Sequence, residues 1–119
     1  MNREQAIINF WRSFGISAYD VGTVPEDAPL PRITYNMAVD YLGNPVFGES
    51  SLWYRSSSWD AITEKSHEIE ERIGRGGICL PYDGGCVWVT RGTPFAQCVT
   101  DEDDTLRRIS HNVTYEFFE

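Results

Sequence analysis

Residues 78–119 read ICLPYDGGCVWVTRGTPFAQCVTDEDDTLRRISHNVTYEFFE, and this stretch decides the fold. The turn signal Asp83-Gly84-Gly85 separates two short apolar runs, which is the pattern of a β-hairpin. After the acidic tetrad 101–104, apolar and polar residues alternate over 107–117, as in a strand with one buried face. We therefore expect a sheet whose strands are joined by polar loops. The stretch contains no recognisable catalytic or cofactor signature.

Two further segments have the spacing of helices. Apolar residues recur every three to four positions over 2–14, and Asn2 with Gln5 forms a capping-box pattern at its start. Residues 59–73 carry a narrower apolar stripe, and a glycine-rich segment beginning at Gly74 ends the pattern. Both helices are predicted to pack on the sheet.

Three segments of the N-terminal half are predicted strands. Residues 33–42 alternate most clearly, residues 49–56 follow after a turn, and residues 17–21 suit a short edge strand. Residues 22–32 between them are rich in proline and acidic side chains and are expected to form an exposed loop. The fold class expected is α+β, in the order α-β-β-β-α-β-β-β, with two helices on one mainly antiparallel or mixed sheet.

Length and net charge limit the classes of function that the chain can have. A chain of 119 residues suits one domain, 1–119, and its 41% hydrophobic content is enough for one core. The 18 acidic and 10 basic side chains give a net charge of −8, which disfavours nucleic-acid binding and favours a partner with a basic surface. No run approaches the ~20 apolar residues of a membrane span, so we expect no membrane association.

Catalytic and metal sites find little support in the sequence. Cys79, Cys86 and Cys98 lack the close pairing of zinc ligands, and three cysteines do not make a disulfide framework. No G-x-S-x-G motif occurs, and the acidic tetrad 101–104 lacks the spacing of a calcium loop. The interpretation favoured is a protein without enzyme activity, cofactor or metal.

Four features, in this order, resemble the tail-terminator (tail-completion, head-tail joining) proteins of siphophages and prophages. They are the helix leading into the proline-bounded acidic loop VPEDAPLP at 24–31, the strand start PRITY at 31–35, the serine-rich helix start SSSW at 56–59, and RGTPF at 91–95 followed by an acidic loop and the closing strand. Their order extends over nearly the whole chain.

The resemblance implies a structural virion-assembly protein that caps the finished tail tube as a ring, typically hexameric, and joins it to the head connector. Its partners would then be further copies of itself, the tail-tube protein and the head-tail connector. It would lie at the tail-head junction of the virion, after assembly in the host bacterial cytoplasm. A head-completion or minor capsid subunit, and a small acidic binding module of the inhibitor or immunity type, stay open as alternatives.

Contacts with partners are expected at loops and exposed aromatic residues. The loops singled out are 25–31, 43–49 and 92–104, and replacing both Asp103 and Asp104 by lysine is expected to weaken docking without unfolding the domain. The candidate interface residues are Pro25, Glu26, Asp27, Phe47, Trp53, Tyr54, Phe95, Asp103 and Asp104.

Overall fold

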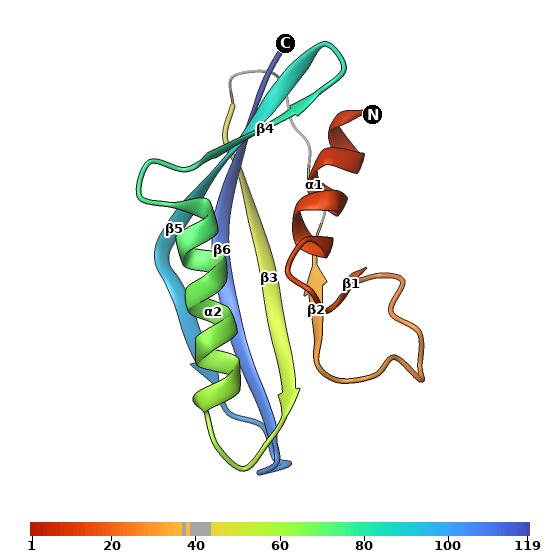
Figure 1. Cartoon of the computed structure of the whole chain (residues 1–119), viewed down its shortest axis with the longest axis vertical. Helices are drawn as coiled ribbons and strands as arrows, with labels where there is room; N and C mark the ends of the chain where they lie inside the picture. The colour runs from red at the N-terminus through yellow and green to blue at the C-terminus, as the bar shows by residue number, and fades with distance from the viewer. Residues whose placement is uncertain (37, 39–43) are drawn as a thin grey trace.

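The computed structural model describes residues 1–36, 38 and 44–119. Its elements are α1 (Arg3–Arg12), β1 (Ser17–Asp20), β2 (Arg32–Tyr35), β3 (Val46–Arg55), α2 (Asp60–Ile73), β4 (Ile78–Tyr82), β5 (Gly85–Val99) and β6 (Leu106–Phe118). This order, shown in Figure 1, confirms the predicted α+β class and the predicted succession of helices and strands.

The six strands form one sheet in the order β1-β2-β3-β6-β5-β4. The β1–β2 pair is parallel and every other neighbouring pair is antiparallel, so the sheet is mixed. Figure 1 shows α1 and α2 on the same face. We call the other side, which neither described helix covers, the open face. Among the described strands, β1 and β4 are the two edges.

Strand β6 is central to the sheet. It pairs with β3 from Leu106 to Tyr115 and with β5 over most of its length. Every second side chain from Ile109 to Phe117 is buried towards the helices, as the alternation in the sequence predicted. These buried residues join the apolar faces of both helices in one core cluster. Burial of this apolar surface is what holds the helices on the sheet.

Both helices begin or end as their sequences indicate. The Asn2 side chain accepts the Gln5 amide at 2.9 Å and the Gln5 side chain accepts the Asn2 amide at 3.0 Å, so the capping box is confirmed. Helix α2 ends at Gly74, whose φ of +76° is a left-handed conformation that favours glycine. Its start lacks a side-chain cap at Trp59, although the Ser58 hydroxyl accepts the Asp60 amide at 3.2 Å.

The segment 92–104 differs from its predicted loop. Strand β5 continues to Val99, and its pairing with β6 shifts between Arg91 and Ala96, so four residues of β5 oppose Asn112 alone. Asn112 donates its side-chain amide to the Pro94 carbonyl at 2.9 Å across this bulge. The Gly and Pro signals mark an irregularity within a strand, because the long partner β6 supplies ladder bonds on both sides of it.

Three other predictions need correction. The apolar run that contains Trp88 predicts a core position for it, but Trp88 is 42% exposed on the open face because Val87 and Val89 on either side of it point inward. Most of the predicted loop 43–49 is strand, since β3 begins at Val46. The predicted strand 33–42 is β2 up to Tyr35; Asn36 and Ala38 are not in a strand, and 37 and 39–42 lie outside the described residues.

A buried hydrogen bond ties the first helix to the last strand, and it yields a stability prediction. Trp11 donates its indole N–H to the Tyr115 hydroxyl at 2.9 Å, and both side chains are fully buried. Tyr115→Phe leaves the indole N–H without an acceptor, so we expect the free energy of unfolding to fall by about 1–3 kcal/mol. Urea denaturation measures this. The control is Tyr82→Phe, which removes an exposed hydroxyl bonded to Glu119; an equal effect of the two variants would contradict the prediction.

Candidate assembly surfaces

The proline-bounded loop between β1 and β2 displays three of the predicted interface residues. Pro25, Glu26 and Asp27 are exposed, and the Ala28 amide donates to the Pro25 carbonyl at 3.1 Å in a local turn. Arg32 donates from Nη1 to the Ala28 carbonyl at 3.0 Å, which ties the loop to the start of β2. The loop therefore presents two carboxylates on a backbone that is anchored at its end.

Three predicted interface residues come from β3 and do not share a face. Phe47 is 82% exposed on the open face, and Trp53 lies on that same face by strand alternation. Tyr54 points to the other side, where it packs partly buried against the core. Burial raises the pKa of the Tyr54 hydroxyl, and Glu68 and Glu64 add to the shift. Phe47 and Trp53 are thus available to a partner on the open face.

Trp53 stands between two arginines in one row across the open face. Arg32 of β2 and Arg108 of β6 are the cross-strand partners of Trp53 in the sheet register. Their guanidinium carbons lie 5.8 Å and 4.7 Å from the centre of the Trp53 ring, within cation–π range. The indole N–H donates to the Thr34 hydroxyl at 2.9 Å, which fixes the ring. The row is held in place before any partner arrives.

Phe95 sits in the β5 bulge, half-buried over the core. Its ring centre lies 5.0 Å from that of His111, and His111 Nε2 is 2.8 Å from the Ser66 hydroxyl oxygen. Ser66 and His111 are both buried, and Nδ1 of His111 has no partner among the described residues. The pair is enclosed in the core, and no described residue bonds to Nδ1 of the imidazole, which is where the orienting third group of a catalytic serine–histidine pair binds.

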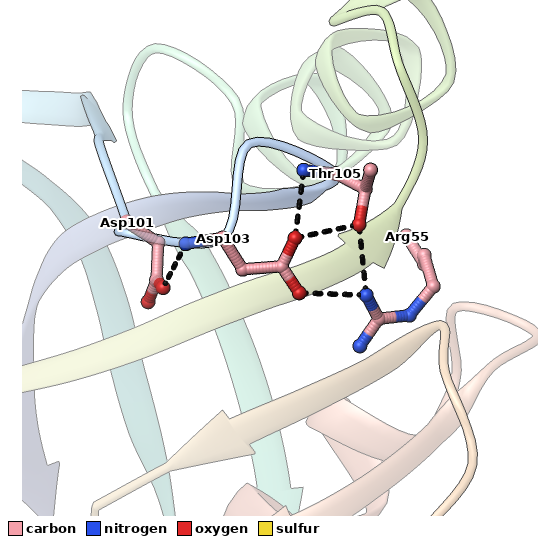
Figure 2. A network of polar contacts seen from close by, with 4 residues as sticks. All are labelled: Arg55, Asp101, Asp103 and Thr105. Atoms are coloured by element: carbon pink, nitrogen blue, oxygen red, sulfur yellow. Dashed lines mark hydrogen bonds and ion pairs between the residues drawn. The ribbon is translucent and has the colours of Figure 1, made fainter.

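The like charges of the acidic tetrad predict an extended, solvated loop; all four residues are exposed, as expected, but hydrogen bonds fold the segment into a turn. Figure 2 shows Asp103 at its centre: one carboxylate oxygen accepts the Thr105 amide and hydroxyl, and the other accepts Arg55 Nη1 at 2.9 Å. Asp101 accepts the Asp103 amide at 3.0 Å. Bonds from the Thr105 hydroxyl, Arg55 and the Thr105 amide hold the pKa of Asp103 well below its usual range. Asp104 is exposed and takes no part in this network.

The described residues assemble no recognisable cofactor or metal site. Within 1–36, 38 and 44–119, no group of three or more His, Cys, Asp or Glu side chains is placed to hold a metal ion. Cys79, Cys86 and Cys98 are free thiols, and a hydrogen bond with Cys86 raises the pKa of Cys79. No helix in the part of the chain described here has the length and apolar character to cross a membrane.

The fold is similar to that of a known virion component. No family model and no curated protein matches the chain. A chain from the solved virion of a native gene transfer agent (GTA) particle superposes with a TM-score of 0.64, over 96% of this chain and 92% of that one. The two sequences are 17% identical, so the likeness is one of fold.

His111 makes the stability depend on pH. Burial lowers its pKa from 6.5 to about 4, so the unfolded chain binds a proton more readily than the folded one. The contribution of His111 to the free energy of unfolding is therefore fully present above pH 6.5. It is lost on acidification towards pH 4, by up to about 1.4 kcal/mol per pH unit. Denaturation of His111→Gln across this pH range should show a smaller decrease of the free energy of unfolding per pH unit. His67→Gln, which changes an exposed imidazole, should keep the original slope; identical slopes for His111→Gln and the unaltered protein would refute this assignment.

The acidic turn gives a second prediction, which separates Asp103 from Asp104. Asp103→Ala removes the acceptor of three hydrogen bonds, so the Thr105 amide should exchange with solvent faster. Asp104→Ala should leave that exchange rate unchanged, and amide exchange by NMR measures both. Equal protection of Thr105 in the two variants would show that the turn does not depend on Asp103. A docking test of this turn therefore needs Asp104 alone, because changing Asp103 also alters the turn itself.

Proposed function

We propose that this chain is a structural subunit of a phage-like virion, which caps the tail tube as a ring and joins it to the head connector. The observation that carries the proposal is the fold likeness to a chain of a gene transfer agent virion, which extends over nearly the full length of both chains. The order of sequence features along the chain, which resembles tail-terminator proteins, supports the same role independently of that likeness.

The sheet has the shape that side-by-side assembly requires. Its edges, β1 and β4, lie at opposite ends of the strand order and each is paired on one side only among the described strands. Edge strands carry unpaired backbone donors and acceptors, and a ring needs two different surfaces on every subunit. Further copies of this chain, the tail-tube protein and the head-tail connector are the partners proposed. The site of action is the tail-head junction, reached after assembly in the host cytoplasm.

The proposal includes the absence of catalysis. Ser66 and His111 form the pair in the described structure that most resembles a nucleophile with its base, and both are enclosed by the core. The three thiols lie on strands of the sheet, and the raised pKa of Cys79 disfavours its reactive thiolate. A structural role uses the surfaces that this fold exposes and needs none of these groups to react.

Binding to tails tests the proposed role. The probe is tail tubes purified from the phage or prophage whose genome encodes this chain, mixed with the purified protein. We expect the protein to bind at one end of each tube as a ring, visible by electron microscopy and as a defined mass increase in light scattering. Tubes that already carry a head, which have no free junction end, are the control and should bind none.

A negative result would have a clear meaning. A monomer that ignores tail tubes at every concentration would contradict the junction role. The net charge of −8 would then direct attention to the acidic binding module and a basic protein partner.

A further inference from the structure

Two arginines of the open face, Arg32 and Arg108, stand out in an acidic chain because no described carboxylate forms an ion pair with them. Arg55 is paired with Asp103, whereas neither Arg32 nor Arg108 forms an ion pair with a described residue. Arg32 uses Nη1 on the Ala28 carbonyl at 3.0 Å, and Arg108 uses its Nε–H on the Ser51 hydroxyl at 3.2 Å. Nη2 of Arg32 and both Nη groups of Arg108 have no hydrogen-bond partner among the described residues, so both guanidinium groups have donors left for an anion.

The surface beside this row is concave and can accommodate a small charged group. A hollow of about 100 Å³ is lined by Thr34, Ser51, Trp53 and Arg108, and Glu49 of the same face also lines it. A water molecule occupies roughly 30 Å³ in the liquid, so the hollow has room for a carboxylate at the arginine. Arginine guanidinium groups match carboxylates in geometry and bind them through paired, charge-assisted hydrogen bonds.

A matching set of carboxylates lies on the opposite side of the same molecule. Glu64, Glu68 and Glu71 recur along α2 at the spacing of one helix face, and all three are exposed. Glu68 contacts Lys65 at 3.1 Å, while Glu64 and Glu71 form no ion pair with any residue described here. We call these three residues the acidic face of α2.

The spacings of the two surfaces agree. Arg32 and Arg108 are separated by two strand intervals, or roughly 10 Å between their backbones. Glu64 and Glu71 are seven residues apart on a helix, which is also roughly 10 Å along its axis. A helix laid across the strands can therefore bring one glutamate to each arginine, with its middle turn over Trp53.

We propose that the open face of one copy binds the acidic face of α2 of the next copy, with Arg32 and Arg108 receiving Glu64 and Glu71. Since the two surfaces lie on opposite sides of the molecule, the contact is head-to-tail and each copy engages two neighbours. This inference names a self-contact for the proposed virion subunit and rests on that function only for its biological setting.

A protein carboxylate suits this row better than a nucleic acid does. DNA-binding proteins draw their affinity from many phosphate contacts, and only two arginines of the described open face, Arg32 and Arg108, lack an ion pair. A neighbouring copy brings its glutamates on a rigid helix, so little conformational freedom is lost on binding.

Charge reversal and its complementation test the contact. The unaltered chain should self-associate at physiological ionic strength, where salt screens the repulsion between two copies of net charge −8, as measured by sedimentation equilibrium. Arg32→Glu with Arg108→Glu should weaken self-association about tenfold or more, and so should Glu64→Lys with Glu71→Lys. An equal mixture of the two double variants should associate again, because each reversed surface then meets a reversed partner.

Matched controls identify the surface that acts. Arg75→Glu with Arg12→Glu makes the same charge change at two exposed arginines that belong to neither surface, and it should leave the association constant close to its original value. Glu26→Lys with Asp27→Lys reverses the exposed loop carboxylates instead, and it should also have little effect. Circular dichroism and thermal unfolding confirm that each variant is folded before its association is measured.

Several results would overturn the inference: a chain that stays monomeric at physiological ionic strength, variants that associate like the unaltered chain, a mixture that fails to restore association, or loss of association on reversing the Glu26–Asp27 pair alone. The outcome is separable from that of the proposed function. Variants that cap tails and self-associate normally would refute the contact and leave the role in place. Complementing association in a protein that ignores tails would do the reverse.

Discussion

The alternation of side chains along β6 is the constraint on which the rest of the structure depends. From Ile109 to Phe117 every second residue is buried against the helices, and the residues between them form the middle of the open face. A slip of one position would exchange the two sets, placing Arg108 in the core and Tyr115 in solvent. The hydrogen bond from Trp11 to Tyr115 forms only in the correct register, because the tyrosine reaches α1 only when it faces inward.

This division into two faces assigns the polar groups to different tasks. Towards the helices, Nε2 of His111 pairs with the Ser66 hydroxyl inside the core, and burial lowers the pKa of the imidazole. On the open face, Arg108 and Trp53 stack where no helix covers them. Residues adjacent in sequence, such as Trp53 and Tyr54, therefore take part in unrelated contacts. An interface on this sheet consists of residues from one face of several strands and not of residues consecutive in the chain.

The elements most visible in the sequence were those with a strong local cause. The capping box at Asn2 and the alternation of β6 were predicted because each rests on a short, regular pattern. The continuation of β5 beyond Arg91 was missed because Gly92 and Pro94 suggest a loop. The ladder that overrides them comes from β6, whose paired residues lie 9 to 15 positions further along the chain. The row of Arg32, Trp53 and Arg108 was equally invisible, since it exists only once β2, β3 and β6 are placed in register.

Net charge alone is a poor guide to what this chain contacts. Within one acidic tetrad, Asp103 accepts intramolecular hydrogen bonds from Thr105 and Arg55, whereas the exposed Asp104 forms none with a described residue. The same contrast separates Arg55, which is already paired, from Arg108, which is not. Two copies of net charge −8 repel one another at a distance, but salt screens that repulsion beyond about 8 Å at physiological ionic strength. Close contacts between unpaired glutamates and unpaired arginines are screened far less, so opposite charges placed on opposite sides of an acidic subunit can still join it to its neighbours.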